Sequence, residues 1–164
     1  MIHLRPAVSE DVPLILRFIR ELAEYERAPD SVVATEEGLL RDGFGETPRF
    51  HVVIAEWEGL AVGFAFYFFQ YSTWLGRPVL YLEDLFVTPS HRRKGIGMEL
   101  MKRLAQEAIA NHCLRFQWSV LNWNAPSIAF YESLGAKLQR DWLAVRIDGD
   151  ALQRLGAKGE RALP

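Results

Sequence analysis

The segment from Tyr81 to Leu100 holds the residues whose types and spacing indicate chemistry most clearly. A predicted strand ends at Thr88-Pro89-Ser90, and the basic turn Arg92-Arg93-Lys94-Gly95-Ile96-Gly97 precedes an amphipathic helix. The first N–H groups of a helix have no intrahelical acceptor, and the helix dipole places partial positive charge at that end. Two glycines let the backbone approach an anion, and three cations add charge. The segment therefore predicts a phosphate or pyrophosphate site.

The spacing of this turn distinguishes it from other phosphate-binding patterns. A Walker loop needs Gly-x4-Gly-Lys-Ser/Thr and the dinucleotide fingerprint needs Gly-x-Gly-x-x-Gly, and the turn matches neither. Arg-x-x-Gly-x-Gly, from Arg92 to Gly97, resembles instead the acetyl-CoA motif of the GNAT acetyltransferase superfamily. The alternative is a helix-capping turn whose basic side chains lie in solvent.

Further motifs resemble those of one group within this superfamily, the diamine (spermidine/spermine) and thialysine acetyltransferases. They are Tyr81-Leu82-Glu83-Asp84-Leu85-Phe86-Val87, Asp42-Gly43-Phe44-Gly45, Asn122-Trp123-Asn124 and Phe130-Tyr131. The resemblance covers residues 2–147. It implies the fold of the superfamily, acetyl-CoA as the acetyl donor, and a homodimer.

The same resemblance suggests which residues would bind acetyl-CoA. The backbone of Leu85, Phe86 and Val87 would pair with the pantetheine amides and present an N–H to the thioester oxygen. The pyrophosphate would lie on the turn and the first helical turn, formed by Arg92, Arg93, Lys94, Gly95, Ile96, Gly97 and Met98. Asn124 could bond the cofactor, although capping of the following helix explains it equally well.

Acetyl transfer to an amine needs a base, because an alkyl ammonium with a pKa of about 10 must lose a proton before it attacks. We expect Glu83 to attract the cationic amine and to accept its proton, through water. Strand alternation places Glu83 and Asp84 on opposite faces, and we favour a structural role for Asp84 while keeping it among the amine-binding candidates. Tyr131, on the helix after Asn124, is the candidate acid for the departing thiolate. Packing in the core is the alternative for Tyr131.

Three more residues are candidates for binding the amine substrate. Glu26 matches a position of the group near the amine, while Tyr25 and Trp74 could flank an aliphatic chain or face a cation. The loop before Trp74 carries Ser72 where the diamine enzymes look acidic, and Arg77 follows. We therefore favour a lysine-like or thialysine-like amine over spermine.

Composition limits the remaining possibilities. The chain has 164 residues, 19 basic and 21 acidic, with a net charge of -2, so nucleic-acid binding is not expected. A single cysteine excludes an intrachain disulfide, and no leader or membrane-spanning apolar run is present, which favours a cytoplasmic protein. The four histidines show no metal-ligand spacing, so we expect no metal. The partners we expect are the small amine and a second copy of the chain.

Periodicity predicts one α+β domain over residues 1–164, of the GNAT fold. We expect a mostly antiparallel central sheet of six to seven strands, flanked by about four helices. Strands are expected over 2–5, 50–57, 60–71, 79–88, 114–121 and 138–147. Helices are expected from about Ser9, as N-cap, to Arg27, and over 35–42, 94–111 and 125–134, with a helical turn at 150–155.

The function we predict is an acetyl-CoA-dependent N-acetyltransferase, acting by direct attack of the amine in a ternary complex. Its substrate would be a thialysine-like or lysine-like amino acid, or a diamine or polyamine. Two alternatives stay open: a catalytically silent acetyl-CoA-binding module, and an acetyltransferase for proteins or peptides.

Overall fold

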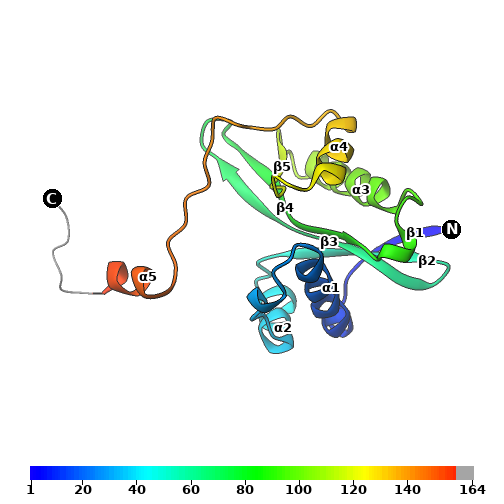
Figure 1. Cartoon of the computed structure of the whole chain (residues 1–164), viewed down its shortest axis with the longest axis horizontal. Coiled ribbons are helices and arrows are strands. Elements are labelled where there is room, and N and C mark those ends of the chain that lie inside the picture. Colours follow the sequence, from blue (N-terminus) through cyan, green and yellow to red (C-terminus); the bar gives the residue numbers. More distant parts are fainter. Residues whose placement is uncertain (158–164) are drawn as a thin grey trace. The chain divides into compact units, whose positions relative to one another are not determined.

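A five-stranded mixed sheet forms the centre of the first part of the chain (Figure 1). The computed structural model describes residues 1–157. It divides the chain into two compact units, one of residues 1–121 and one that begins at Asn122. The prediction of one domain over residues 1–164 extends past the described residues and stays a prediction.

The strand order follows the sequence. The first four strands pair as antiparallel neighbours and the fifth runs parallel to the fourth. Their bounds are β1 Ile2–Pro6, β2 His51–Trp57, β3 Leu60–Ser72, β4 Arg77–Val87 and β5 Phe116–Trp118. The short turns after Trp57 and Ser72 make two successive hairpins.

Three α-helices of the first unit cover the two faces of this sheet (Figure 1). They are α1 Val12–Tyr25, α2 Glu36–Phe44 and α3 Ile96–Ala110. One face packs its aromatic side chains, Phe50, Phe64 and Phe86, against α1 and α2. The other face, with Leu80 and Leu82 buried, packs against α3. The amphipathic patterns predicted these helices because a helix in a layered domain must bury its apolar stripe.

The start of α1 differs from the prediction. Ser9 begins a 3-10 turn, and Asp11 is the N-cap of α1. The Asp11 carboxylate accepts hydrogen bonds from the Val8 N–H (2.8 Å) and from the Arg5 guanidinium (2.6 and 2.9 Å). The Asp11 side chain makes no capping hydrogen bond to α1 itself, and instead ties the chain before the helix and Arg5 of β1 to the helix start.

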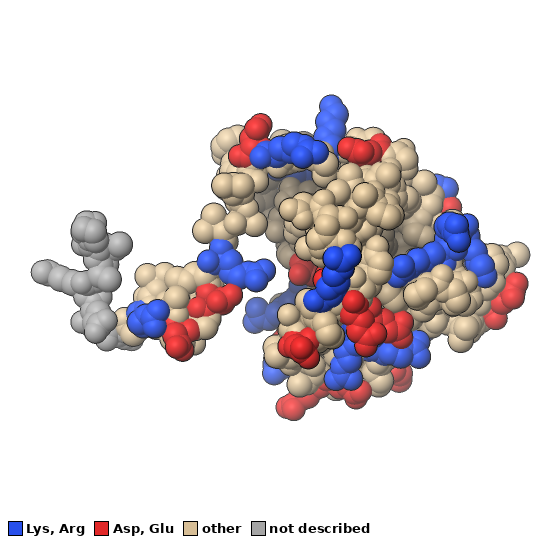
Figure 2. All heavy atoms as spheres, in the orientation of Figure 1, with Lys and Arg blue, Asp and Glu red and all other residues tan. Residues whose placement is uncertain are grey.

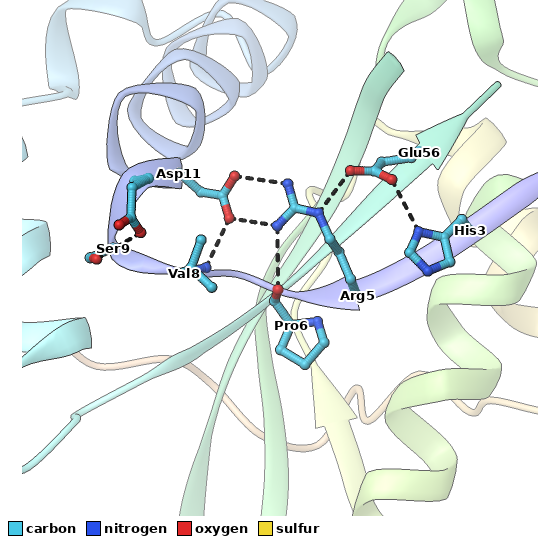
Figure 3. A network of polar contacts seen from close by, with 8 residues as sticks. His3, Arg5, Pro6, Val8, Ser9, Asp11 and Glu56 are labelled. Carbon is cyan, nitrogen blue, oxygen red and sulfur yellow. Dashed lines mark hydrogen bonds and ion pairs between the residues drawn. The ribbon is translucent and has the colours of Figure 1, made fainter. Parts of the chain in front are cut away.

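Arg5 joins this helix start to the sheet (Figure 3). Besides Asp11 it donates to Glu56 of β2 (2.7 Å), and Glu56 in turn contacts His3 (3.0 Å). Hydrogen bonds from the Arg5 guanidinium hold the pKa of Asp11 and the pKa of Glu56 below their ordinary values. The network fixes one end of α1, whose other end carries Tyr25 and Glu26.

The predicted strand at 138–147 is wrong, and with it the count of six to seven strands. Residues 138–147 form no strand, and their apolar side chains are exposed, Val145 at 94 % and Leu143 at 86 %. A strand needs a neighbouring edge for its backbone hydrogen bonds, and the described residues provide no pairing for this segment. The described residues of the second unit form two helices, α4 Ala125–Ser133 and α5 Gly149–Gly156.

Basic and acidic side chains alternate in small groups over the face drawn in Figure 2. This distribution agrees with the near balance of 19 basic and 21 acidic residues. Among the described helices, none is long and apolar enough to cross a membrane.

Candidate active site

The basic turn adopts the backbone that an anion site needs. Gly95 is the N-cap of α3 and has a φ of 81°, in the left-handed region where a side chain is strained. A Cβ built on Gly95 would meet nothing within 4 Å, so its backbone faces open space. His91 supports the turn from the strand side through contacts of its Nδ1 with the hydroxyls of Thr88 (3.1 Å) and Ser90 (3.0 Å).

The three cations of the turn lie in different surroundings. Arg93 and Lys94 are exposed, and the Lys94 ammonium lies 4.9 Å from the ring centre of Trp57. Arg92 turns back onto the protein, where its Nε donates to the Val87 carbonyl (3.0 Å). The turn thus presents two exposed positive charges and one guanidinium that is held against the protein. Sequence patterns gave no signal for Trp57, because its contact with Lys94 exists only once β2 and the turn are folded together.

One edge of β4 is open next to this turn. The parallel ladder with β5 joins Leu80–Leu82 to Phe116–Trp118 and, among the described residues, ends there. From Glu83 to Val87, β4 pairs with β3 on one side only. Backbone N–H and C=O groups at a free strand edge are ready to pair with an extended ligand. This is the stretch, Leu85, Phe86 and Val87, that the sequence predicts to bind pantetheine.

A β-bulge separates the surroundings of Glu83 and Asp84. The β3–β4 register pairs Phe66 with Asp84 and Tyr67 with Leu82, which leaves Glu83 without a partner. Glu83 is exposed, whereas Asp84 points to the face that packs against α1. Bulges redirect side chains in this way and are common beside active sites. The two acids therefore lie in different environments, although strand alternation alone did not reveal the bulge.

Asp84 is the most strongly perturbed carboxyl group of the site. Burial, together with the nearby charges of Glu83 and Glu26, raises its pKa to about 7. Desolvation also raises the pKa of Glu26, at the end of α1, although its side chain keeps access to solvent. A structural role was favoured for Asp84, but no hydrogen bond to its side chain occurs among the described residues. Unbalanced negative charge of this kind attracts a cation.

Trp74 lies far from these acids along the sheet. It is 88 % exposed at the tip of the β3–β4 hairpin, where Ser72 pairs with Arg77. Arg77 is the first residue of β4 and Asp84 lies further along it, roughly 20 Å away at about 3.3 Å per residue. Within one chain, the fold does not bring Trp74 together with Glu26 and Asp84.

Two predicted site residues belong to the second unit. Asn124 is buried and caps α4, because its Oδ1 accepts a hydrogen bond from the Ser127 N–H (3.4 Å). Tyr131 is half-buried on α4, with its ring centre 5.4 Å from that of Phe130. The capping role of Asn124 is confirmed, while the role of Tyr131 stays a prediction.

The structure also has a small pocket away from the predicted site. It lies at the start of β2, between the end of α2 and α3, and its polar lining includes His51, Tyr67 and the Arg103–Glu107 ion pair. None of the predicted site residues lines it. In the described part of the chain, no three His, Cys, Asp or Glu side chains come together in a way that could hold a metal ion.

A basic, glycine-containing turn at a helix start, an open strand edge and a cluster of acids are the features expected of an acetyl-CoA-dependent acyltransferase. The model of the family described as "Acetyltransferase (GNAT) family" matches residues 15–136. The chain belongs to this family and is an N-acetyltransferase that acts on an amine.

The chain is similar to two curated relatives and one solved structure over most of its length. The chain is 41% identical to a thialysine N-epsilon-acetyltransferase of Sus scrofa, over 94% of this chain and 97% of the relative. It is 46% identical to the spermidine/spermine N(1)-acetyltransferase-like protein 1 of Homo sapiens, over 82% of this chain but 20% of that protein. An integron cassette protein from the mobile metagenome of V.cholerae has a TM-score of 0.79 at 30% identity, covering 94% and 96% of the two chains.

Proposed function

We propose that this enzyme transfers acetyl from acetyl-CoA to the primary amine of a small molecule, with a thialysine-like or lysine-like amino acid favoured over a polyamine. The observation that carries the proposal is Asp84. Its carboxyl group is held at a pKa of about 7 beside Glu26, on the strand that leads directly into the basic turn. In this proposal, a single short segment carries both the amine site and the phosphate site.

The residues of the turn fit acetyl-CoA, which supplies the acetyl group as a thioester when bound. The free edge of β4 from Leu85 to Val87 suits the two amides of an extended pantetheine arm. The open backbone at Gly95 and the first N–H groups of α3, at Ile96, Gly97 and Met98, suit a pyrophosphate. Arg93 and Lys94 are exposed and add positive charge.

The acids would bind the amine as a cation and then accept its proton. An ammonium with a pKa of about 10 and an acid with a pKa near 7 differ by about three units, and desolvation of the ammonium narrows this gap. A base works best when its pKa lies near the working pH, which favours Asp84. Glu83, the candidate predicted from the sequence, remains suited to accepting the proton through water because it is exposed.

Tyr131 is the proposed donor of the proton that the departing thiolate needs. A phenol can give up a proton and regain it from solvent. The proposal is supported by the motif Asn124 to Tyr131, in which the cap fixes where α4 begins and so which way Tyr131 projects.

The preference for an amino acid depends on Ser72 and Arg77. An amino acid substrate has a carboxylate that Arg77 could bind, whereas Ser72 leaves the loop without an acid for a polycation. A lysine-like substrate spans less than about 10 Å between its side-chain amine and its carboxylate. Since Arg77 lies roughly 20 Å from Asp84 along β4, Trp74 and Arg77 would have to come from a second copy of the chain.

A homodimer is therefore part of the proposal. Independent support comes from the exposed apolar side chains of the second unit: Trp142 at 73 %, Leu143 at 86 % and Val145 at 94 %. Such a run of apolar, β-forming residues is unusual on a monomer and typical of an interface.

The test is release of free CoA, followed with a thiol reagent, from acetyl-CoA and a panel of thialysine, lysine, putrescine, spermidine and a basic peptide. We expect the highest kcat/KM with thialysine, with large losses for Asp84→Asn and Tyr131→Phe. Glu46→Gln, an exposed acid away from the site, is the control and should keep full activity. Higher kcat/KM with spermidine would reject the amino acid preference. Turnover of the peptide alone would identify a peptide acetyltransferase, and acetyl-CoA binding without turnover of any amine would identify a binding module.

A further inference from the structure

Arg92 opens the phosphate-binding motif, yet its side chain is occupied elsewhere. Its guanidinium carbon lies 4.6 Å from the ring centre of Tyr25 and 5.9 Å from that of Phe86. Its Nε donates to the Val87 carbonyl at 3.0 Å. Phe86 belongs to the core on the α1 face, so the Arg92 side chain lies on the same side of the sheet as α1.

These contacts join the two halves of the active site. Val87 is the last residue of β4, and Tyr25 is the last residue of α1. Glu26 follows Tyr25 directly, and Arg27 then reverses the chain with a φ of 63°. A cation beside the end of a helix also interacts favourably with the negative end of its dipole. Arg92 therefore fastens the end of α1 to the strand that carries Asp84.

We propose that Arg92 is a positioning residue for the amine site: through its stack on Tyr25 it holds Glu26 beside Asp84, and so couples the phosphate-binding turn to the amine-binding acids. The proposal rests on the proposed function for the identity of the amine site. Arg93 and Lys94, which are exposed, remain the cations available to a phosphate.

The coupling is mechanical rather than electrostatic. The charges that raise the pKa of Asp84 are those of Glu83 on its own strand and Glu26 on α1, and the residue opposite it on β3 is the uncharged Phe66. Arg92 is not among the groups that act on this pKa. Loss of the stack should therefore reach Asp84 only by moving Glu26 away.

Three variants test this chain of contacts. Tyr25→Leu removes the aromatic face but keeps an apolar side chain, Tyr25→Phe keeps the ring, and Arg92→Met keeps the length of the arginine without its charge. Arg17→Met is the matched control, because the Arg17 guanidinium stacks 5.1 Å from the Phe18 ring on the same helix, away from the site. Each variant is checked first by its thermal unfolding.

Two readouts do not need turnover: titration of the Asp84 carboxyl carbon by NMR, and CoA affinity by calorimetry. We expect Tyr25→Leu to shift the Asp84 titration to lower pH, because Glu26 moves away, with CoA affinity unchanged. Tyr25→Phe and Arg17→Met should leave that titration as in the wild type. In steady state, Tyr25→Leu should raise KM for thialysine by up to about threefold to fivefold, with a smaller change in kcat.

The double variant Arg92→Met/Tyr25→Leu decides between positioning and phosphate binding. We expect its Asp84 titration and its KM for thialysine to match those of Tyr25→Leu alone, because the two substitutions break the same contact. Additive effects of the two substitutions on KM for thialysine would overturn the proposal. Weaker CoA binding by Arg92→Met with an unchanged Asp84 titration would also overturn it. If the wild type acetylates none of the amines, the proposed function fails, while the titration and CoA affinities still decide the role of Arg92.

Discussion

The carboxyl group of Glu26, at the end of α1, lies near enough to Asp84 on β4 for its charge to raise the pKa of Asp84. The two acids come from elements on opposite sides of the contact between helix and sheet. At Asp84 no nearby cation among the described residues offsets the repulsion, since burial and the charges of Glu83 and Glu26 all raise its pKa. Like charges that remain together in a folded protein mark a binding site for the opposite charge.

Replacing Glu26 by Gln should make the site less attractive to a cation. Removal of a like charge lowers the pKa of Asp84, so the acidic limb of the kcat/KM profile should move to lower pH. The KM for the cationic amine should rise about threefold to fivefold, the size expected for one partly exposed ion pair. The pH profile of kcat/KM measures the first effect and saturation kinetics the second. Glu24→Gln, an exposed acid on the same helix, should change neither. A shift of the limb to higher pH would contradict the arrangement.

Replacing Gly95 by Ala should weaken CoA binding about tenfold, because the new side chain disfavours the left-handed backbone at the start of α3. Calorimetry with CoA measures this loss. Gly76→Ala is a matched control, since Gly76 also has a positive φ, 59°, and open space around its Cβ. Both variants should lose about 1 kcal/mol of stability, but only Gly95→Ala should change CoA affinity. If Gly95→Ala bound CoA as tightly as the wild type does, the turn would not be the phosphate site.

Replacing Asp11 by Asn should lower the free energy of unfolding by about 1–3 kcal/mol near neutral pH, because Arg5 loses a charged partner. Arg5 holds the pKa of Asp11 below its ordinary value. The carboxylate therefore stabilises the fold above about pH 4, and this contribution disappears as the pH falls through the lowered pKa of the folded state. Urea denaturation should show that the free energies of unfolding of wild type and variant become equal at acidic pH. Glu10 is an exposed neighbour, and Glu10→Gln should change the free energy of unfolding little. If Asp11→Asn remained less stable than the wild type in acid, the ion pair would not be the cause of its lower stability.

Mixing two inactive variants tests whether Trp74 acts across a dimer. If Asp84→Asn and Trp74→Ala are each impaired and their subunits exchange, a mixed dimer contains one intact composite site. An equal mixture should then recover about a quarter of the wild-type activity, since about half the dimers are mixed and each has one good site. Differently tagged chains allow the mixed dimer to be purified and assayed. No recovery in that dimer would place Trp74 in the same site as the Asp84 of its own chain, or outside the site.

Replacing Trp142 and Val145 together by Ser should convert a dimer into monomers, because it removes two of the most exposed apolar side chains of the second unit. Sedimentation velocity measures the change. Replacement of Val33, exposed at 88 % in the first unit, by Ser is the control for general loss of apolar surface. A wild-type protein that sediments as a monomer would remove the dimer from the proposal.

Local patterns were enough to predict most elements of the first unit. The predicted strand over 60–71 occurs as Leu60–Ser72 and the predicted helix over 94–111 as Ile96–Ala110. These elements follow from apolar periodicity and from turn residues, which act over a few neighbours along the chain. The phosphate-binding turn was recognised for the same reason, because its glycine and its cations are contiguous. The segment 138–147 shows the limit: its residues favour a strand, but a strand also needs an edge to pair with.

The sequence by itself determined the family, the turn at Arg92 to Gly97 and the presence of two adjacent acids, since each is written in contiguous residues. Only the tertiary structure decided which acid becomes perturbed. The bulge in β4 leaves Glu83 in solvent and turns Asp84 toward α1, where burial and Glu26 raise its pKa. The tertiary structure also places the Arg92 guanidinium over the Tyr25 ring rather than in open solvent. Such effects depend on which side chains, distant in sequence, are buried next to one another, and the periodicity of the sequence does not predict that.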